Sequence, residues 1–255
     1  MTHATHNLPP GRVSAVLFDW DGTLVDTGEI LLACWHTMTE EVLGYRFPST
    51  EEEQRWALSR RAAESFPQLA SDPDVVARMH VAFTGAYRAI AAEHVRAHPG
   101  AEELLRGLVA RGVRTGVVTS KTTDRVTIDA ELTGLTSLVD VIITGDDVEQ
   151  GKPDPQGIRM ALTALGVDAA AALYVGDGTV DIRAGKAAGL RTVALTHGLS
   201  DRAGLEAENP DLIMDDLSPL LGAVERADGP AADAEPHATP ASNPARGDRP
   251  SKEHT

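Results

Sequence analysis

Continuous apolar runs recur along the chain, and segments with helical spacing separate them. Uninterrupted apolar runs are typical of parallel strands that are buried on both faces. The runs cover residues 15–19, 115–120, 140–146, 172–177 and 191–198. Gly112, Gly166 and Gly189 follow the helical segments, at positions where helices commonly end. This alternation predicts an α/β fold with a doubly wound parallel sheet.

A different pattern interrupts the alternation between residues 28 and 95. Three helix-like segments follow one another there without a strand, at residues 28–44, 49–66 and 72–95. We therefore predict an inserted α-helical cap at residues 28–95, with residues 13–27 and 96–225 forming the α/β core. Such a cap would close over a ligand site and exclude water from it.

Both ends of the chain are poor in apolar residues. Residues 1–12 have little apolar content, and residues 226–255 contain five prolines but no Val, Ile, Leu, Met, Phe, Trp, Tyr or Cys. Segments of this composition cannot bury enough surface to order themselves. We predict a flexible N-terminus at residues 1–12 and a disordered tail at residues 226–255, which acts as a solvated tether or as a docking peptide for a partner.

The composition describes an acidic protein with an ordinary hydrophobic content. Of the 255 residues, 42% are hydrophobic, which suffices for a core, and the formal net charge is −15. Nucleic acids and anionic membranes are bound through clustered Lys and Arg, so this charge argues against both as partners. Cys34 is the single cysteine, which excludes an internal disulfide, and no leader or membrane span is expected. We expect a cytoplasmic protein that binds a small molecule, and the sequence does not indicate an oligomeric state.

Polar residues stand where the predicted strands end. Asp19, Thr119, Asp177 and Thr196 each lie at or near the carboxyl end of an apolar run. Ligands of open α/β sheets bind in the crevice outside these ends, so the four segments are expected to meet at one site. Asp19 is followed two residues later by Asp21, and a strand end has no need of two carboxylates that repel each other. The pair therefore indicates a chemical role.

Four short motifs follow one another along the chain: "DWDGT", "VVTS", "GKPDP" and "GDGTVD". In this order they resemble the motifs of the haloacid dehalogenase superfamily, and the resemblance covers roughly residues 13–222. The stretches "DDVEQGKPDP" and "VGDGTVDIRAGKAAG" are similar to the phosphoglycolate phosphatase and pyrophosphatase-like branch. The resemblance implies a Rossmann-like core, a helical cap and a phosphatase that acts on a small phosphorylated metabolite.

The resemblance also implies a role for each motif. Asp19 would attack phosphorus and form an aspartyl-phosphate, and Asp21 would protonate the leaving oxygen and then activate water. Lys152 would neutralise charge on the nucleophile and on the phosphoryl oxygens, which Thr119 and the Ser120 amide would also hold. The expected phosphate-binding residues are Gly22, Thr119, Ser120 and Lys152.

Charge at such a site calls for a metal ion. Asp19, Asp21, Asp177 and Asp181 would bring up to four negative charges to a pocket for a phosphate dianion. Like charges about 4 Å apart repel by roughly 4 kcal/mol at an effective dielectric near 20. Mg²⁺ suits a set of oxygen ligands. We predict Mg²⁺ held by the Asp19 carboxylate, the Asp21 carbonyl and Asp177, with Asp181 as a further ligand or behind the others.

The substrate is indicated less sharply. Arg60 and Arg61 lie where capped relatives place a recognition loop, so one of them could bind a second anionic group; the alternative is pairing with residues 51–53 or exposure to solvent. Leu31 stands where sugar phosphomutases carry a histidine, which favours hydrolysis over phosphoryl transfer. Pyrophosphate and sugar phosphates remain alternatives, as does a non-catalytic module that binds a phosphorylated metabolite.

Overall fold

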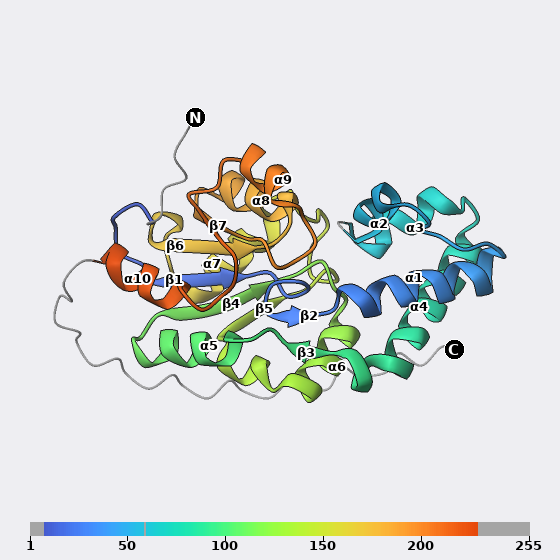
Figure 1. The fold of residues 1–255 in the computed structure, drawn as a ribbon, viewed down its shortest axis with the longest axis horizontal. Coiled ribbons are helices and arrows are strands. Elements are labelled where there is room, and N and C mark those ends of the chain that lie inside the picture. Colours follow the sequence, from blue (N-terminus) through green and yellow to red (C-terminus); the bar gives the residue numbers. More distant parts are fainter. Residues whose placement is uncertain (1–7, 59, 229–255) are drawn as a thin grey trace, which may run out of the picture.

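The computed structural model describes residues 8–58 and 60–228 and contains two units, which lie side by side in Figure 1. One unit is an α/β core built on a six-stranded sheet. The other consists of four helices that are inserted between the first and second long strands of that sheet. The functional question is therefore how the sheet and the helices share one site.

The main sheet is parallel throughout, with strand order β5-β4-β1-β6-β7-β8. Its strands are β1 (Ala15–Phe18), β4 (Arg114–Val118), β5 (Val141–Ile143), β6 (Ala172–Gly176), β7 (Arg191–Leu195) and β8 (Leu212–Met214). The chain extends the sheet on one side of β1 and then on the other, which creates a switch point beside β1 where ligands of such sheets bind. The predicted doubly wound α/β fold is confirmed.

Burial on both faces explains why the strands read as continuous apolar runs. In β1, Val16 and Phe18 belong to one hydrophobic cluster, whereas Ala15 and Leu17 belong to a second. Figure 1 shows α5 and α6 on one side of the sheet and α8 on the other. The core helices are α5 (Ala101–Ala110), α6 (Thr123–Thr133), α7 (Gln156–Leu165), α8 (Thr179–Ala188), α9 (Arg202–Ala207) and α10 (Leu220–Asp228).

The inserted helical unit is built around aromatic side chains. Its helices are α1 (Gly28–Leu43), α2 (Glu51–Leu58), α3 (Ala62–Leu69) and α4 (Pro73–His94). Trp35 makes edge contacts with Phe47, Trp56, Phe66 and Phe83, with ring centroids 5.9, 6.2, 5.2 and 5.9 Å away. Among the helices that the structure describes, none is long and apolar enough to cross a membrane.

Two short strands join the helical unit to the core. The chain enters the unit after β2 (Val25–Asp26) and leaves it through β3 (Arg96–Ala97). These strands pair antiparallel, so the entry and exit of the insertion lie next to each other. The helices consequently begin and end close to the carboxyl end of β1.

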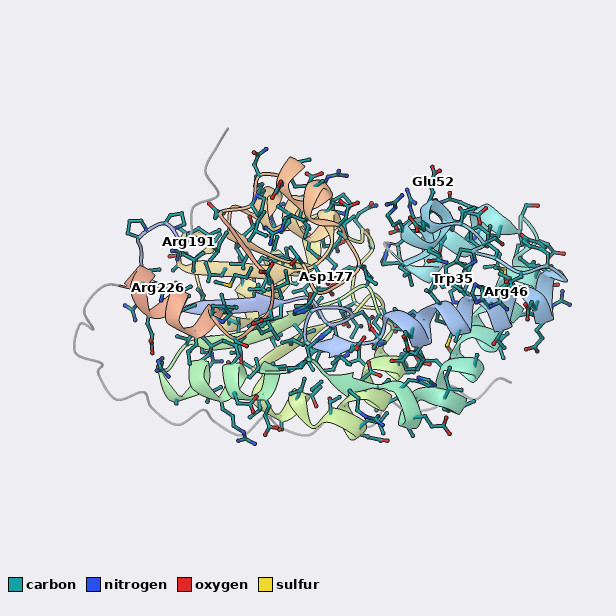
Figure 2. The ribbon with its side chains drawn as sticks, viewed as in Figure 1. Trp35, Arg46, Glu52, Asp177, Arg191 and Arg226 are labelled. Atoms are coloured by element: carbon teal, nitrogen blue, oxygen red, sulfur yellow. The ribbon has the colours of Figure 1, made fainter. Side chains whose placement is uncertain are left out.

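The described chain is ordered further at both ends than its composition indicated. Leu8 is buried, and the Arg191 guanidinium donates to three backbone carbonyls within residues 9–12. Helix α10 continues to Asp228, and Figure 2 shows Arg226 at the same end of the core as Arg191. The expectation of unstructured ends is therefore wrong for these two short stretches, because Leu8 and α10 bury apolar surface against the core. Residues 1–7 and 229–255, which carry the rest of both predicted termini, lie outside the described residues.

Candidate active site

A cavity of about 390 Å³ lies between the carboxyl ends of the strands and the helical unit. Aromatic side chains of the insertion, such as Trp35 and Phe83, line one side, and charged groups of the core line the other. Figure 2 shows Asp177 on the side of the core that faces the insertion. The predicted site residues that line this cavity are Asp19, Asp21, Arg60, Thr119, Ser120, Lys152, Asp177 and Asp181. Gly22 and Arg61 do not belong to its lining.

Asp19 follows β1 directly, and the contacts that position its side chain are made by Oδ1. This oxygen accepts a hydrogen bond from the Trp20 amide at 2.7 Å and lies 2.8 Å from Lys152 Nζ. Burial raises the pKa of Asp19 to about 8, and the neighbouring Asp177 and Asp181 charges add to this effect while Lys152 opposes it. Among the described residues no group donates to Oδ2, so this oxygen is available to a substrate or a metal ion.

Asp177 follows β6 and is fixed through both carboxylate oxygens. The Thr23 hydroxyl donates to Oδ1 at 2.7 Å, and the Leu199 amide donates to Oδ2 at 2.7 Å. Burial raises the pKa of Asp177 to about 7, with the charge of Asp181 as a further cause. Gly22 makes the close approach possible, because its φ of 77° favours glycine and a Cβ there would lie 2.5 Å from Asp177 Oδ2.

Lys152 lies in the loop after β5 and places its ammonium group between two carboxylates. Its Nζ atom is 2.6 Å from Asp181 Oδ1 and 2.8 Å from Asp19 Oδ1. Burial disfavours the ammonium form, but the charges of Asp181 and Asp19 outweigh it and hold the pKa of Lys152 well above its usual value. Asp181 is fixed in turn by the Gly178 amide, which donates to its Oδ2 at 2.8 Å. Lys152 is therefore a fixed cation beside Asp19.

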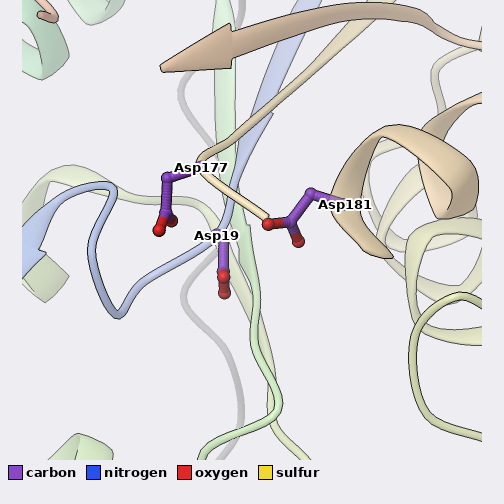
Figure 3. Close-up of side chains that lie close together, drawn as sticks. All are labelled: Asp19, Asp177 and Asp181. Carbon is purple, nitrogen blue, oxygen red and sulfur yellow. The ribbon is translucent and has the colours of Figure 1, made fainter. Parts of the chain in front are cut away.

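Three carboxylates of the site face a common space. Asp19, Asp177 and Asp181 each offer an oxygen, and these three oxygens lie within 4.8 Å of one another. Figure 3 shows the three side chains close together. They come from the ends of two neighbouring strands and from the first turn of α8. The raised pKa values of Asp19 and Asp177 mean that burial and the neighbouring carboxylates disfavour the ionised forms of both side chains. A donor set made only of oxygens fits Mg²⁺, so these residues are suited to hold it.

The Asp21 side chain points to a different set of partners. Its Oδ1 accepts hydrogen bonds from the Thr27 hydroxyl and from Lys121 Nζ, each at 2.6 Å. Burial alone would raise the pKa of Asp21, but the Lys121 charge and these two hydrogen bonds outweigh burial and lower it. The Asp21 carboxylate is thus ionised and held apart from the Asp19 cluster, which leaves its backbone carbonyl as the predicted metal ligand.

Thr119 and Ser120 stand at the carboxyl end of β4, as the sequence predicted. The Thr119 amide donates to the Ile143 carbonyl at 2.9 Å, which continues the pairing of β4 with β5. The Thr119 hydroxyl accepts from the Lys121 amide at 3.2 Å. Both residues line the cavity and so lie within reach of a bound ligand.

Arg60 and Arg61 have different surroundings. Arg60 lines the cavity, and its guanidinium carbon lies 5.2 Å from the centre of the Trp56 ring. Arg61 Nε is 2.8 Å from Glu64 Oε1, and its remaining nitrogens donate to backbone carbonyls within residues 145–149 at 3.1–3.2 Å. Arg61 therefore ties α3 to a loop of the core, whereas Arg60 remains the candidate for substrate contact.

A family model of haloacid dehalogenase-like hydrolases matches residues 16–195, which include all of β1 but its first residue, the whole insertion and β7. The chain belongs to this family. It is 34% identical to the pyrophosphatase PpaX of Bacillus velezensis over 220 residues, which cover 82% of this chain and 95% of that protein. The haloacid dehalogenase-like family and its phosphatase branch, as predicted from the four motifs, are confirmed, and the chain is a hydrolase.

Solved structures of this family have the same architecture. The structure of CbbY from Rhodobacter sphaeroides in complex with phosphate superposes with a TM-score of 0.74 at 26% identity, covering 84% of this chain and 99% of that chain. A mutant of CbbY in complex with xylulose-(1,5)bisphosphate gives a TM-score of 0.72 at 26% identity, covering 83% and 99%. The fold predicted for this haloacid dehalogenase-like hydrolase is thereby supported along most of its length.

Several residues around the site of this haloacid dehalogenase-like hydrolase were given no role by the sequence analysis. They are Thr23, Thr27, Lys121, Arg125 and Asp129, of which Lys121 and Arg125 line the cavity. Lys121 comes directly after the motif "VVTS", so its place beyond a strand end is the signal that could have found it, as it found Thr119. Asp129 lies inside α6, where an acidic residue gives no comparable signal.

Proposed function

We propose that this protein is a Mg²⁺-dependent phosphatase that hydrolyses a small phosphate monoester through an aspartyl-phosphate, in the manner of phosphoglycolate phosphatases. The observation that carries the proposal is the surroundings of Asp19: a buried carboxylate with Lys152 at 2.8 Å on Oδ1 and with no donor on Oδ2 among the described residues. A fixed cation on one oxygen orients the other for attack on phosphorus. Asp21, two residues on, adds a second carboxylate that lines the same cavity.

The first step forms the aspartyl-phosphate. Asp19 attacks phosphorus through Oδ2 in its ionised form, which bound Mg²⁺ would favour although burial raises the pKa of Asp19 in the free protein. The bond from phosphorus to the ester oxygen breaks, and that oxygen leaves with a proton from Asp21. Asp21 is ionised in the free protein, and entry of a phosphate dianion beside it raises its proton affinity, so it takes up a proton as the substrate binds. Lys152, Thr119 and the Ser120 amide stabilise charge on the phosphoryl oxygens.

The second step releases phosphate. Water attacks the aspartyl-phosphate, its proton passes to the Asp21 carboxylate, and the bond between phosphorus and Asp19 Oδ2 breaks. Asp21 ends this step protonated and Asp19 ends it ionised. Closure of the cavity by the aromatic side chains of the insertion limits competing water during the first step.

Mg²⁺ is proposed to be held by Asp19, the Asp21 carbonyl and Asp177, with Asp181 beside them. The three clustered carboxylates of Asp19, Asp177 and Asp181 stand against the single ammonium group of Lys152, which pairs with two of them. A phosphate dianion adds further negative charge, so binding requires additional positive charge. When bound, Mg²⁺ would supply that charge and orient the phosphoryl group.

A second candidate substrate is pyrophosphate. The relative PpaX is named as a pyrophosphatase, and Arg60 and Arg125 line the cavity together with the two lysines. A guanidinium group can donate two parallel hydrogen bonds to the oxygens of one phosphoryl group, so two arginines suit a substrate with two phosphoryl groups. We also propose that the protein acts on a cytoplasmic metabolite.

The experiment that tests this function measures phosphate release from pyrophosphate, 2-phosphoglycolate, a sugar phosphate and 4-nitrophenyl phosphate, with Mg²⁺ and with EDTA. We expect Mg²⁺-dependent turnover of one metabolite far above the others. If pyrophosphate exceeds every monoester, the second candidate replaces the first. If the folded, Mg²⁺-loaded protein releases phosphate from none of them, the proposal fails and a binding module becomes the better interpretation.

Gly22→Ala is expected to abolish most of the turnover. Its new Cβ would lie 2.5 Å from Asp177 Oδ2 and displace this carboxylate, and the positive φ of 77° adds strain of about 1 kcal/mol. Gly44→Ala is the matched control. Gly44 has a φ of 78°, but among the described residues, its own atoms and its two chain neighbours aside, no heavy atom lies within 4 Å of the point that a Cβ would occupy. Thermal unfolding should show a loss of stability in both variants, larger in Gly22→Ala because the displaced Asp177 carboxylate is held by hydrogen bonds from Thr23 and Leu199. Only Gly22→Ala should lose phosphatase activity. Equal activities would contradict the role of Gly22.

Arg60→Ala is expected to raise KM by about threefold to tenfold for a substrate with a second anionic group, and less for 4-nitrophenyl phosphate. Arg60 lines the cavity, so its loss removes a cation that such a group can meet. Arg61→Ala serves as the comparison, since its contacts join α3 to the core loop and it should affect both substrates alike. Steady-state kinetics with both esters checks this, and a selective effect of Arg61→Ala would reverse the assignment.

A further inference from the structure

Lys121 is a buried lysine whose three ammonium protons all have acceptors. Its side chain is fully buried, and Nζ donates to Asp21 Oδ1 at 2.6 Å, to Asp129 Oδ2 at 2.6 Å and to the Tyr87 hydroxyl at 2.8 Å. A buried ammonium group is costly unless it is paired and hydrogen-bonded. Complete pairing fixes the position of Nζ, because movement in any direction breaks one of the three bonds.

The acceptors of Lys121 are themselves held from separate elements. Asp129 of α6 accepts from the Trp20 indole at 2.8 Å and from the Tyr87 hydroxyl at 2.6 Å. Trp20, Tyr87 and Asp129 are all fully buried. Lys121, Asp129, Tyr87 and Trp20 therefore form a connected hydrogen-bond network. Asp21, which the proposed reaction uses, joins this network through Lys121.

The contact with Asp21 involves only one carboxylate oxygen. Lys121 and the Thr27 hydroxyl both donate to Oδ1, and among the described residues none donates to Oδ2. This arrangement fixes the rotation of the carboxylate and leaves Oδ2 free. It is the arrangement that a group needs when it must hand a proton to a leaving oxygen from a defined position.

We propose that Lys121 is a positioning residue, which holds the Asp21 carboxylate for proton transfer and is itself held by Asp129 and by Tyr87 of the insertion. The inference rests on the proposed phosphatase function, in which Asp21 protonates the leaving group. Tyr87 lies on α4, so the helical unit supplies one of the three acceptors that hold Lys121. The insertion thus contributes to the chemical step as well as to the cavity wall.

The test compares two esters that differ in their need for an acid. The leaving group of phenyl phosphate is a strong base, so its oxygen has to be protonated as the bond to phosphorus breaks. The leaving group of 2,4-dinitrophenyl phosphate is a weak base and departs without a proton. Lys121→Met keeps the length of the side chain but cannot donate. It should lower kcat/KM, which reports formation of the aspartyl-phosphate and not the later attack of water, by about 10- to 100-fold for phenyl phosphate and by less than about threefold for the dinitrophenyl ester. Lys121→Arg can donate to both carboxylates and should recover part of the loss.

Two further variants keep the test decisive if Lys121→Met fails to fold. Tyr87→Phe removes one hydroxyl and should show a smaller loss with the same dependence on the leaving group. Leu105→Ala removes buried side-chain volume in α5 without removing a hydrogen bond of this network, and should affect both esters alike even if it destabilises the protein.

Asp21→Asn distinguishes the acid role of Asp21 in the proposed function from the positioning role of Lys121. It should show the largest dependence on the leaving group, and if it shows none, the acid role in the proposed function fails together with this inference. If Asp21→Asn shows the dependence but Lys121→Met and Tyr87→Phe lower both esters equally, the proposed function stands and the positioning role of Lys121 is overturned.

Discussion

Asp19→Asn is expected to lower phosphate release by a factor on the order of 10⁴ or more, because it removes the attacking oxygen of the proposed reaction. Asparagine keeps the shape of the side chain and can still accept a hydrogen bond from the Trp20 amide, which holds Oδ1 at 2.7 Å. The loss should therefore appear in kcat in a protein that remains folded. The measurement is steady-state phosphate release with saturating Mg²⁺.

The stability of this variant gives an independent readout. Burial raises the pKa of Asp19 from its ordinary value of 3.8 to about 8, so the folded protein holds the carboxyl proton more tightly than the unfolded chain does. The resulting stabilisation is complete below pH 3.8 and is lost as the pH rises towards about 8. Asparagine has no proton to lose. In EDTA near pH 8 the variant should unfold at the same temperature as the wild type or higher.

Asp26→Asn is the matched control for Asp19→Asn. Asp26 lies exposed in β2, seven residues further along the chain, and it does not line the cavity. The same chemical change at this position should leave turnover within about twofold of the wild type, as surface substitutions usually do. Substantial turnover by Asp19→Asn would remove the aspartyl-phosphate from the mechanism.

Removal of the metal is expected to have the second largest effect. EDTA should reduce turnover to background, and excess Mg²⁺ should restore it, because the carboxylates of Asp19, Asp177 and Asp181 otherwise repel the phosphate dianion. Mg²⁺ should also raise the unfolding temperature, since a ligand at 100 times its Kd stabilises the folded state by about 2.7 kcal/mol. Phosphate release and thermal unfolding are to be measured on the same samples.

Two asparagine variants test whether the rise in unfolding temperature with Mg²⁺ comes from the cluster of Asp19, Asp177 and Asp181. Asp177→Asn removes one carboxylate of the cluster and should abolish the thermal shift by Mg²⁺. Asp201 also lines the cavity but lies outside the cluster, and Asp201→Asn should keep the shift. Full activity in EDTA, or an unchanged shift in Asp177→Asn, would contradict the proposed metal site.

The strands and their terminal residues could be predicted from the sequence because burial on both faces leaves a strong local signal. The run at residues 15–19 places Asp19 after β1, and the run at residues 172–177 places Asp177 after β6. Strand β8 was not predicted. Only Ile213 of its three residues is β-branched, whereas the equally short edge strand β5 is β-branched throughout and therefore has a clearer strand signal.

The contacts that position Lys121 and Arg61 could not be predicted, because their partners are distant in the sequence. Lys121 meets Asp21 across 100 positions of the chain and Tyr87 across 34. Arg61 looked like a candidate for the substrate, but its guanidinium is occupied by carbonyls of residues 145–149. Only the folded chain shows which of two adjacent arginines reaches the cavity.

The pairing of β2 with β3 has a consequence for how this protein can change in evolution. Val25 lies opposite Ala97 and Asp26 lies opposite Arg96, so the two ends of the insertion meet. A segment whose ends meet can be exchanged for another without stretching the chain that carries it. Recombination at this junction can therefore exchange the insertion while the carboxylates to which we assign the reaction are inherited unchanged. One constraint remains on any such replacement: it has to supply an acceptor where the Tyr87 hydroxyl receives Lys121.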